Sequence, residues 1–220
     1  YQLIMQSTQN SNDKKVLTDF SSGYRYRPYW SPDSKKIVFI DHAMDISLYN
    51  IAKEEVQKID HCNWKMHGGL MNFSVDWSSD GKWLTYARGN GNNQNGQIFL
   101  YNTENNQLHQ VTSKYYDDSD PAFDPAGKYL YFLSNRHFSP EYSDMDNSFI
   151  YPNSTKLVAV TLRNDVGSPL SAKNDTVAIK KEEVEEEAKD DGKKEKEKKE
   201  EGKKLEIDLE NFEERMVVLP

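Results

Sequence analysis

The sequence is poor in cysteine and in apolar residues, and it has no long hydrophobic run. Cys62 is the only cysteine, which excludes an internal disulfide framework and leaves the redox compartment open. No apolar run approaches the roughly 20 residues that cross a bilayer, so we expect no membrane span. Apolar residues make up 36% of the 220 residues. Part of the chain should therefore be solvated rather than packed in one core.

Positively charged residues are fewer than negatively charged ones. The sequence has 28 Lys and Arg residues against 36 Asp and Glu residues, which gives a net charge of −8. Affinity for nucleic acids comes mostly from clustered Lys and Arg, so we expect no nucleic-acid partner. The chain opens with YQLIMQSTQN, which has neither an initiator Met nor a charged-then-apolar leader. This opening indicates an excerpt from a longer protein.

One pattern occurs three times: an aromatic residue, an acidic turn and an apolar run. The copies are RPYWSPDSKKIVFI (27–40), SVDWSSDGKWLTYA (74–87) and DPAFDPAGKYLYFL (120–133). Aligning Trp30 with Trp77 and Phe123 gives offsets of 47 and 46 residues. This period is typical of the four-stranded blade of a β-propeller. Repetition also favours a packing unit over a catalytic motif, because a catalytic group is needed only once.

Each copy predicts two strands joined by a tight turn. Gly81 and Gly127 hold the turn position that most needs a positive φ, and Ser34 replaces glycine there at a conformational cost. The apolar runs 36–40, 83–87 and 129–133 are too short for helices and predict buried strands. Third strands are expected from residues 45, 96 and 155, and fourth strands at 56–60 and 108–112.

These elements predict an all-β chain of antiparallel four-stranded β-propeller blades, too few to close a ring. We expect the end of an upstream blade at 1–19, three successive blades at 20–162, a charged insertion or linker at 163–204, and the start of the next blade or of a second propeller at 205–220. Residues 180–204 are almost all charged, so they cannot offset their ordering entropy by burial. A charged partner for this run stays open.

The candidate catalytic and metal-binding residues all have simpler structural interpretations. His61, Cys62 and His67 offer three zinc ligands where a structural site needs four, and Cys62 lacks the third member of a catalytic set. Asp117, Asp118, Asp120 and Asp124 lack the alternation and terminal Glu of a calcium loop, and are interpreted as turn and strand residues.

Other segments lack the context that would make them functional. Ser22 lies in ordinary loop sequence, without the nucleophile elbow of a serine hydrolase. The glycines from Gly89 lack the Lys and the strand-then-helix context of a phosphate loop, and indicate a hairpin loop. The aromatic side chains are expected to pack between blades: Tyr24, Tyr26, Tyr29, Trp30, Trp64, Trp77 and Trp83. We therefore assign no catalytic, cofactor-binding or metal-binding residue.

The three repeats resemble those of TolB-type proteins, prolyl oligopeptidase relatives and tricorn-like serine peptidases. The C-terminal LEIDLENFEERMVVLP is similar to a junction in the tricorn-like family, where a six-bladed propeller ends and a seven-bladed one begins. The matching residues are Ile207, Asp208, Phe212, Arg215, Leu219 and Pro220. The resemblance implies the N-terminal six-bladed propeller of a large prokaryotic serine peptidase, periplasmic or cytoplasmic, whose catalytic Ser, His and Glu lie in a later domain.

The function implied by this resemblance is noncatalytic: filtering or channelling oligopeptides to a catalytic domain outside the chain. The expected partners are oligopeptides and other domains of the same chain, and homo-oligomerisation is left open. Two alternatives remain at this point, a TolB-like periplasmic scaffold that binds proteins and the propeller of a prolyl oligopeptidase relative. The first would require ring closure without a peptidase core, and the second an α/β-hydrolase domain.

Overall fold

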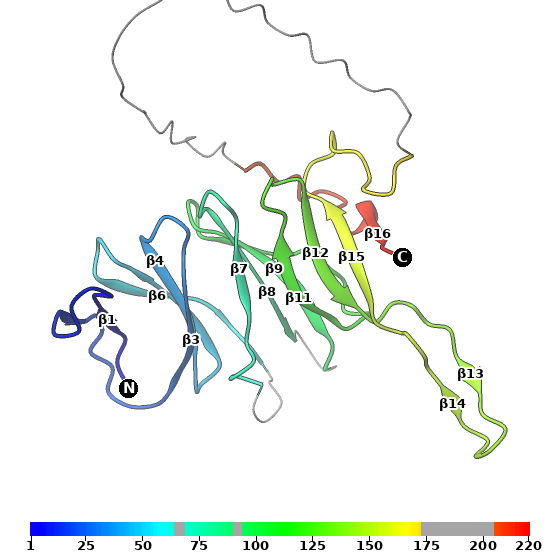
Figure 1. The fold of residues 1–220 in the computed structure, drawn as a ribbon, viewed down its shortest axis with the longest axis horizontal. Helices are drawn as coiled ribbons and strands as arrows, with labels where there is room; N and C mark the ends of the chain where they lie inside the picture. Colours follow the sequence, from blue (N-terminus) through cyan, green and yellow to red (C-terminus); the bar gives the residue numbers. More distant parts are fainter. Residues whose placement is uncertain (64–68, 90–93, 173–204) are drawn as a thin grey trace, which may run out of the picture.

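The computed structural model describes residues 1–63, 69–89, 94–172 and 205–220. Three antiparallel four-stranded sheets stand side by side in chain order, and two small two-stranded sheets accompany them (Figure 1). Within the described residues, the only helical element is the 3-10 turn η1 (Glu213–Arg215), and no helix is long and apolar enough to cross a membrane. The predicted all-β class with four-stranded blades is confirmed.

Each large sheet is one blade. Blade 1 consists of β3 (Arg25–Trp30), β4 (Lys36–Asp41), β5 (Asp45–Asn50) and β6 (Glu55–His61). Blade 2 consists of β7 (Val75–Trp77), β8 (Trp83–Gly89), β9 (Gly96–Asn102) and β10 (Gln107–Gln110). Blade 3 consists of β11 (Asp118–Phe123), β12 (Tyr129–Ser134), β15 (Lys156–Thr161) and β16 (Met216–Val218). In each blade, the first-named strand lies at one edge of the sheet and the last-named strand at the other.

The core lies between the blades rather than inside any one of them. Strand β9 shows the reason, because its apolar residues alternate between two neighbours. Phe99 and Tyr101 pack with blade 1, whereas Ile98 and Leu100 pack with blade 3. Successive side chains of a strand point to opposite faces, so a continuous apolar run is the pattern of a strand that is buried on both faces.

The outer face of blade 1 is covered by a hairpin of β1 (Ile4–Gln6) and β2 (Lys14–Val16). Leu3 and Leu17 pack there against Ile37, Phe39 and Tyr49. The hairpin therefore occupies the position of a preceding blade. That it is the end of such a blade stays a prediction.

A buried ion pair also joins blades 1 and 2. Arg88 on β8 donates from Nη2 to Asp60 Oδ1 on β6 at 2.8 Å, and its guanidinium lies 3.9 Å from the centre of the Phe99 ring. Tyr86 donates its hydroxyl to Asp60 Oδ2 at 2.9 Å. Burial and, to a smaller extent, the charge of Asp60 raise the pKa of Tyr86 well above its usual range. Asp60 thus accepts from two side chains of the neighbouring blade.

The C-terminal segment corrects the predicted domain boundaries. Residues 205–220 do not begin a following blade, because β16 pairs antiparallel with β15 through Val158–Val218, Ala159–Val217 and Val160–Met216. Strand β16 is the fourth strand of blade 3. Residues 163–204 are consequently an insertion between two strands of one sheet, and 173–204 lie outside the described residues.

The repeated turns have the predicted backbone. Gly81 and Gly127 both have φ of +67°, and Ser34 at the same position has φ of +57°. In the first two turns a serine and an aspartate hold the bend: Ser31 donates its hydroxyl to Asp33 at 2.6 Å, and blade 2 repeats this contact. Ser34 is therefore the one member of the set that carries a Cβ in the left-handed region.

We predict that Ser34→Gly stabilises the protein. The substitution relieves the left-handed cost of a Cβ and should raise the free energy of unfolding by about 0.5–1 kcal/mol. The reverse change, Gly81→Ala, should lower it by about 1–2 kcal/mol. Gly81 is the matched site because an added Cβ there would meet Asp33 at an ordinary 3.5 Å. Urea unfolding followed by tryptophan fluorescence measures both changes, and equal effects of the two substitutions would contradict the prediction.

Candidate functional site

The structure places His61 and Cys62 in structural roles. His61 Nδ1 lies 2.6 Å from Asp45 Oδ1, and Lys58 Nζ lies 2.7 Å from the same oxygen. Burial opposes ionisation of Asp45, but hydrogen bonds from Lys58 and His61 outweigh it and hold the pKa of Asp45 below its usual range. Cys62 is fully buried in the core between blades 1 and 2. His67, the third member of the candidate zinc set, lies outside the described residues.

The four clustered aspartates point to four different groups. Asp117 accepts from the Gly96 backbone N–H at 2.7 Å, and Asp118 is paired with Arg136. Asp120 accepts from the Ser74 hydroxyl, and Asp124 accepts from the Lys128 backbone N–H. The carboxylates therefore serve turns and strands, as the sequence predicts. Within the described part of the chain, no group of three or more His, Cys, Asp or Glu residues is placed to hold a metal ion.

The aromatic residues have mixed positions. Trp77 packs between blades 1 and 2, and Trp83 between blades 2 and 3, as expected. Trp30 is 46% exposed, so the expectation of inter-blade packing is wrong for this residue. Tyr24 is also exposed and stacks on Tyr1 with ring centres 4.3 Å apart. Trp64, and residues 90–93 of the glycine-containing loop, lie outside the described residues.

The candidate functional surface is the edge where the blades converge. Strands β7 and β11, the first strands of their blades, contact each other directly. The Ser74 hydroxyl donates to Asp120 Oδ1 at 3.3 Å, and the Tyr29 hydroxyl donates to the Phe73 carbonyl at 2.8 Å. Blades that meet at their first strands fan out at their last strands. The first strands thus form the inner edge, which faces the axis of a propeller.

One polar position recurs along this inner edge. Arg27, Ser74 and Asp120 occupy the same place in the three repeats, and all three are at least partly exposed. Arg27 and Asp120 each have φ of +50° and lie at β-bulges, where the register shifts between the first and second strands of the blade. Bulges re-aim side chains and often lie beside functional sites. The three side chains lie in the repeats, but the sequence gives no sign of the bulges at Arg27 and Asp120.

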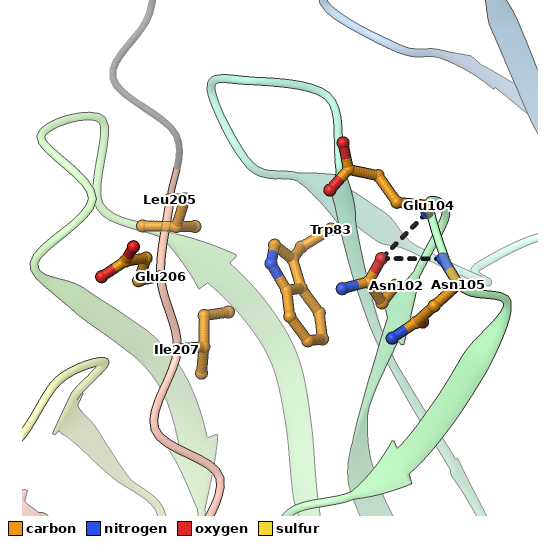
Figure 2. A pocket seen from close by; sticks show the side chains of 7 residues that line it. All are labelled: Trp83, Asn102, Glu104, Asn105, Leu205, Glu206 and Ile207. Carbon is orange, nitrogen blue, oxygen red and sulfur yellow. Dashed lines mark hydrogen bonds between the residues drawn. The ribbon is translucent and has the colours of Figure 1, made fainter.

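The C-terminal segment crosses the contact between blades 2 and 3. The backbone N–H of Leu205 donates to Asp80 Oδ2 at 2.8 Å, and the Leu205 side chain enters the core between these blades. Figure 2 shows this segment beside the Trp83 ring, with Ile207 facing the same space. The hollow there has a volume of about 390 Å³ and is lined by Trp83, Asn102, Glu104, Asn105, Leu205, Glu206 and Ile207. It is open and largely polar, and none of its lining residues forms a catalytic set.

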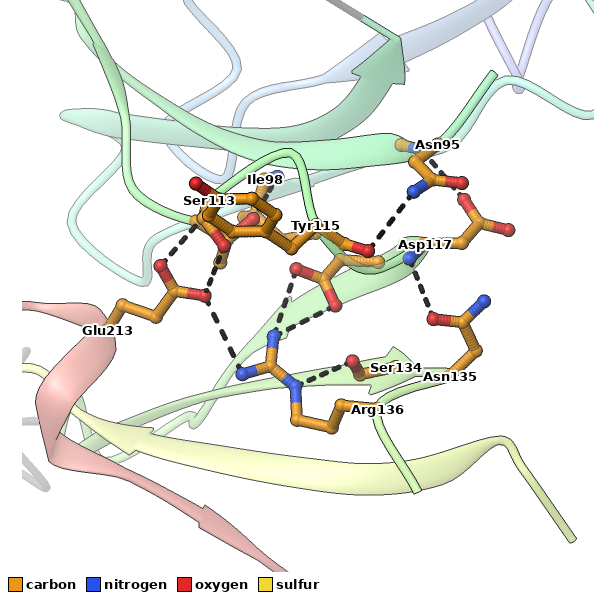
Figure 3. Close-up of polar contacts among 12 residues, drawn as sticks. Asn95, Ile98, Ser113, Tyr115, Asp117, Ser134, Asn135, Arg136 and Glu213 are labelled. Atoms are coloured by element: carbon orange, nitrogen blue, oxygen red, sulfur yellow. Dashed lines mark hydrogen bonds and ion pairs between the residues drawn. The ribbon is translucent and has the colours of Figure 1, made fainter. Parts of the chain in front are cut away.

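Glu213 attaches the C-terminal segment to the blades at the end opposite to Leu205 (Figure 3). Its carboxylate accepts from the Ser113 backbone N–H at 2.9 Å and from the Ser113 hydroxyl at 3.0 Å. It also lies 3.6 Å from Arg136 Nη1, while Arg136 Nη2 donates to Asp118 Oδ1 at 3.1 Å. Arg136 in turn donates from Nε to the Ser134 hydroxyl at 2.7 Å. The network ties the tail to both blades 2 and 3.

The residues that match the junction motif stabilise this tail. The Arg215 guanidinium donates to the backbone carbonyls of Thr161, Asp208 and Glu210. It also lies 5.3 Å from the centre of the Phe212 ring, and Phe212 is buried in the core between blades 2 and 3. The motif therefore closes blade 3 around its long insertion and supplies no reactive group.

Comparisons with known proteins identify the family to which this chain belongs. A family model described as the tricorn protease second beta propeller domain matches residues 1–220. A putative tricorn-like protease C-terminal subunit from Sulfurisphaera tokodaii is 28% identical over 178 residues, which cover 81% of this chain and 20% of that protein. A tricorn protease homolog from Saccharolobus solfataricus is 28% identical over 156 residues, which cover 71% of this chain and 14% of that protein.

The fold agrees with these matches. A crystal structure of the tricorn protease superimposes with a TM-score of 0.68 at 16% identity, over 94% of this chain and 18% of that chain. The chain thus spans a fifth or less of the relatives that it matches. The resemblance to tricorn-like peptidases is confirmed. The matching model, however, describes the second propeller domain, which replaces the expected placement in an N-terminal six-bladed propeller.

We predict that Glu213→Ala destabilises the protein. The change leaves the Ser113 N–H without its acceptor and removes one of the two carboxylates beside Arg136, which should lower the free energy of unfolding by about 1–3 kcal/mol. Glu214, the adjacent exposed residue of η1, is the matched control, and Glu214→Ala should change stability by less than about 0.5 kcal/mol. Urea denaturation measures both. Indistinguishable midpoints for the two variants would show that the tail does not depend on this carboxylate.

Proposed function

We propose that this chain is a noncatalytic propeller portion of a serine-type peptidase. The reason is that the chain belongs to the family of the tricorn protease second β-propeller domain. In this proposal it filters or channels oligopeptides toward a catalytic domain elsewhere in the parent protein. The catalytic Ser, His and Glu belong to that domain, and no residue of this chain is assigned to the chemistry.

The observation that carries the proposal is the polar inner edge of the blades. Arg27, Ser74 and Asp120 recur at one position of the repeat and are exposed to solvent, whereas the apolar residues on the faces of the blades are packed against neighbouring sheets. A polar wall suits an extended peptide, whose backbone N–H and C=O groups need hydrogen-bonding partners. A narrow axis admits an extended chain and excludes a folded domain.

Two features support a role in access rather than in reaction. The candidate nucleophile Cys62 is buried in a core, and the clustered aspartates are engaged with turns and strands. A rigid inner edge, by contrast, follows from the packing of blades on both faces. Such a wall can discriminate between substrates by size without contacting the bond that is cleaved.

The test adds bulk to the inner edge of the parent peptidase. We expect Ser74→Trp to lower kcat/KM for long peptides roughly ten-fold, equal to about 1.4 kcal/mol of barrier, because the indole narrows the path. Activity on a short fluorogenic peptide should be unchanged. Steady-state kinetics on a series of peptides of increasing length measures the size dependence.

Two controls separate bulk from other effects. Ser74→Ala removes the hydrogen bond to Asp120 without adding volume, and should leave the length dependence intact. Asp13→Trp adds the same indole at an exposed turn of the β1–β2 hairpin, away from the inner edge. If Ser74→Trp slows short and long peptides equally, or slows neither, access is not controlled at this edge.

A further inference from the structure

Blade 3 carries an appendage that blades 1 and 2 lack. The second and third strands are joined by residues 42–44 in blade 1 and by 90–95 in blade 2, but by residues 135–155 in blade 3. This segment, the arm, contains a hairpin of β13 (Glu141–Tyr142) and β14 (Phe149–Ile150). Figure 1 shows the arm projecting from the end of β12 and β15, away from all three blades. No sequence motif predicts the arm.

The arm exposes an unusual amount of apolar surface. Met145 is 98% exposed and Phe138 is 74% exposed. Its exposed large apolar residues are Phe138, Tyr142, Met145, Phe149, Ile150 and Tyr151. The four rings form two contacting pairs, with centres 5.5 Å apart for Phe138 and Tyr151 and 5.9 Å apart for Tyr142 and Phe149. Large exposed apolar surface marks protein interaction sites.

The hairpin cannot account for its own stability. Only two residue pairs join β13 to β14, and a single two-stranded hairpin is marginally stable in water. The base, however, is held firmly. The Asp117 backbone N–H donates to Asn135 Oδ1 at 2.8 Å, and Arg136 is bound to Asp118, Ser134 and Glu213 (Figure 3). These contacts therefore fix the position at which the arm leaves the blade.

The charge of the arm indicates the charge of the surface that it binds. Residues 137–155 contain Glu141, Asp144 and Asp146 but no Lys or Arg. Hydrogen bonds from Ser143 and Ser148 hold the pKa of Asp146 below its usual range. A surface that combines aromatic side chains with carboxylates is complementary to an apolar groove flanked by cations.

We propose that the arm docks in an apolar groove flanked by Lys side chains on another domain of the same parent polypeptide. The chain spans a fifth or less of its relatives, so in those relatives most of the polypeptide lies outside the matched part. A domain connected by the chain is present at a high effective concentration, which favours it over a separate molecule. This inference rests on the family and does not depend on peptide filtering.

The first experiment identifies the partner by its charge. The native parent peptidase is treated with a carbodiimide, which joins a carboxylate to a lysine amine without a spacer, and the products are mapped by mass spectrometry. We expect Glu141, Asp144 or Asp146 to be joined to lysines of another domain. In a mixture of unlabelled and ¹⁵N-labelled parent protein, each cross-link should join two peptides of the same label.

The second experiment measures whether the arm is covered. Met145→Ser with Ile150→Ser removes apolar surface but keeps Phe138, Tyr142 and Phe149, the three aromatic residues after which chymotrypsin can cleave the arm; Tyr151 precedes Pro152 and is not a site. Cleavage within the arm should become at least roughly ten-fold faster in this variant of the parent protein, because a docked hairpin is protected in proportion to its bound fraction. Met71→Ser removes an equally apolar side chain that is 60% exposed outside the arm, and should leave the rate unchanged.

Three results would overturn the proposal. Cleavage of the unaltered arm as fast as that of the double variant would show that nothing covers it. Cross-links between differently labelled copies would assign the groove to a second molecule. A fully protected arm without any cross-link to lysine would contradict the cationic character of the groove.

Discussion

A blade cannot cover either of its own faces, and this constraint governs the structure. Strands such as β9 are apolar on both sides, so each sheet is stable only between two neighbours. The buried Asp60–Arg88 pair belongs to the same constraint, because a charge removed from water requires a partner from the adjoining sheet. Convergence of the first strands follows from stacking twisted sheets side by side, and it produces the exposed polar inner edge.

The tail of the chain extends this logic to the end of blade 3. A three-stranded sheet would leave β15 as an open edge and would leave Leu162 and its neighbours in the core without cover. Residues 205–220 provide both the missing strand and a cover, since β16 pairs with β15 while Leu205 and Phe212 enter the core. A charged insertion of any length is tolerated between β15 and β16 because loop-closure entropy grows slowly with length.

The sequence predicts the repeated parts of the fold and much less of the unrepeated parts. The blades and the turn backbone at Gly81 and Ser34 follow from local chemistry that recurs three times. The pairing of β16 with β15 does not, because residues 162–215 separate the two strands and local patterns carry no information on long-range register. The bulges at Arg27 and Asp120 are also not predicted from the sequence, because neither residue type requires a positive φ. The arm is missed because strands of two residues have no detectable period.

Arg136 links the two unrepeated features of blade 3. It lies at the base of the arm, and it contacts both Asp118 of the first strand and Glu213 of the tail. The two carboxylates share one guanidinium, so the tail and the base of the arm meet at the same side chain. In blade 1 the second and third strands are joined by residues 42–44 alone, so no comparable arm is present there. The repeats thus supply a rigid frame, and the residues specific to blade 3 place the arm and the tail on it in a fixed relation.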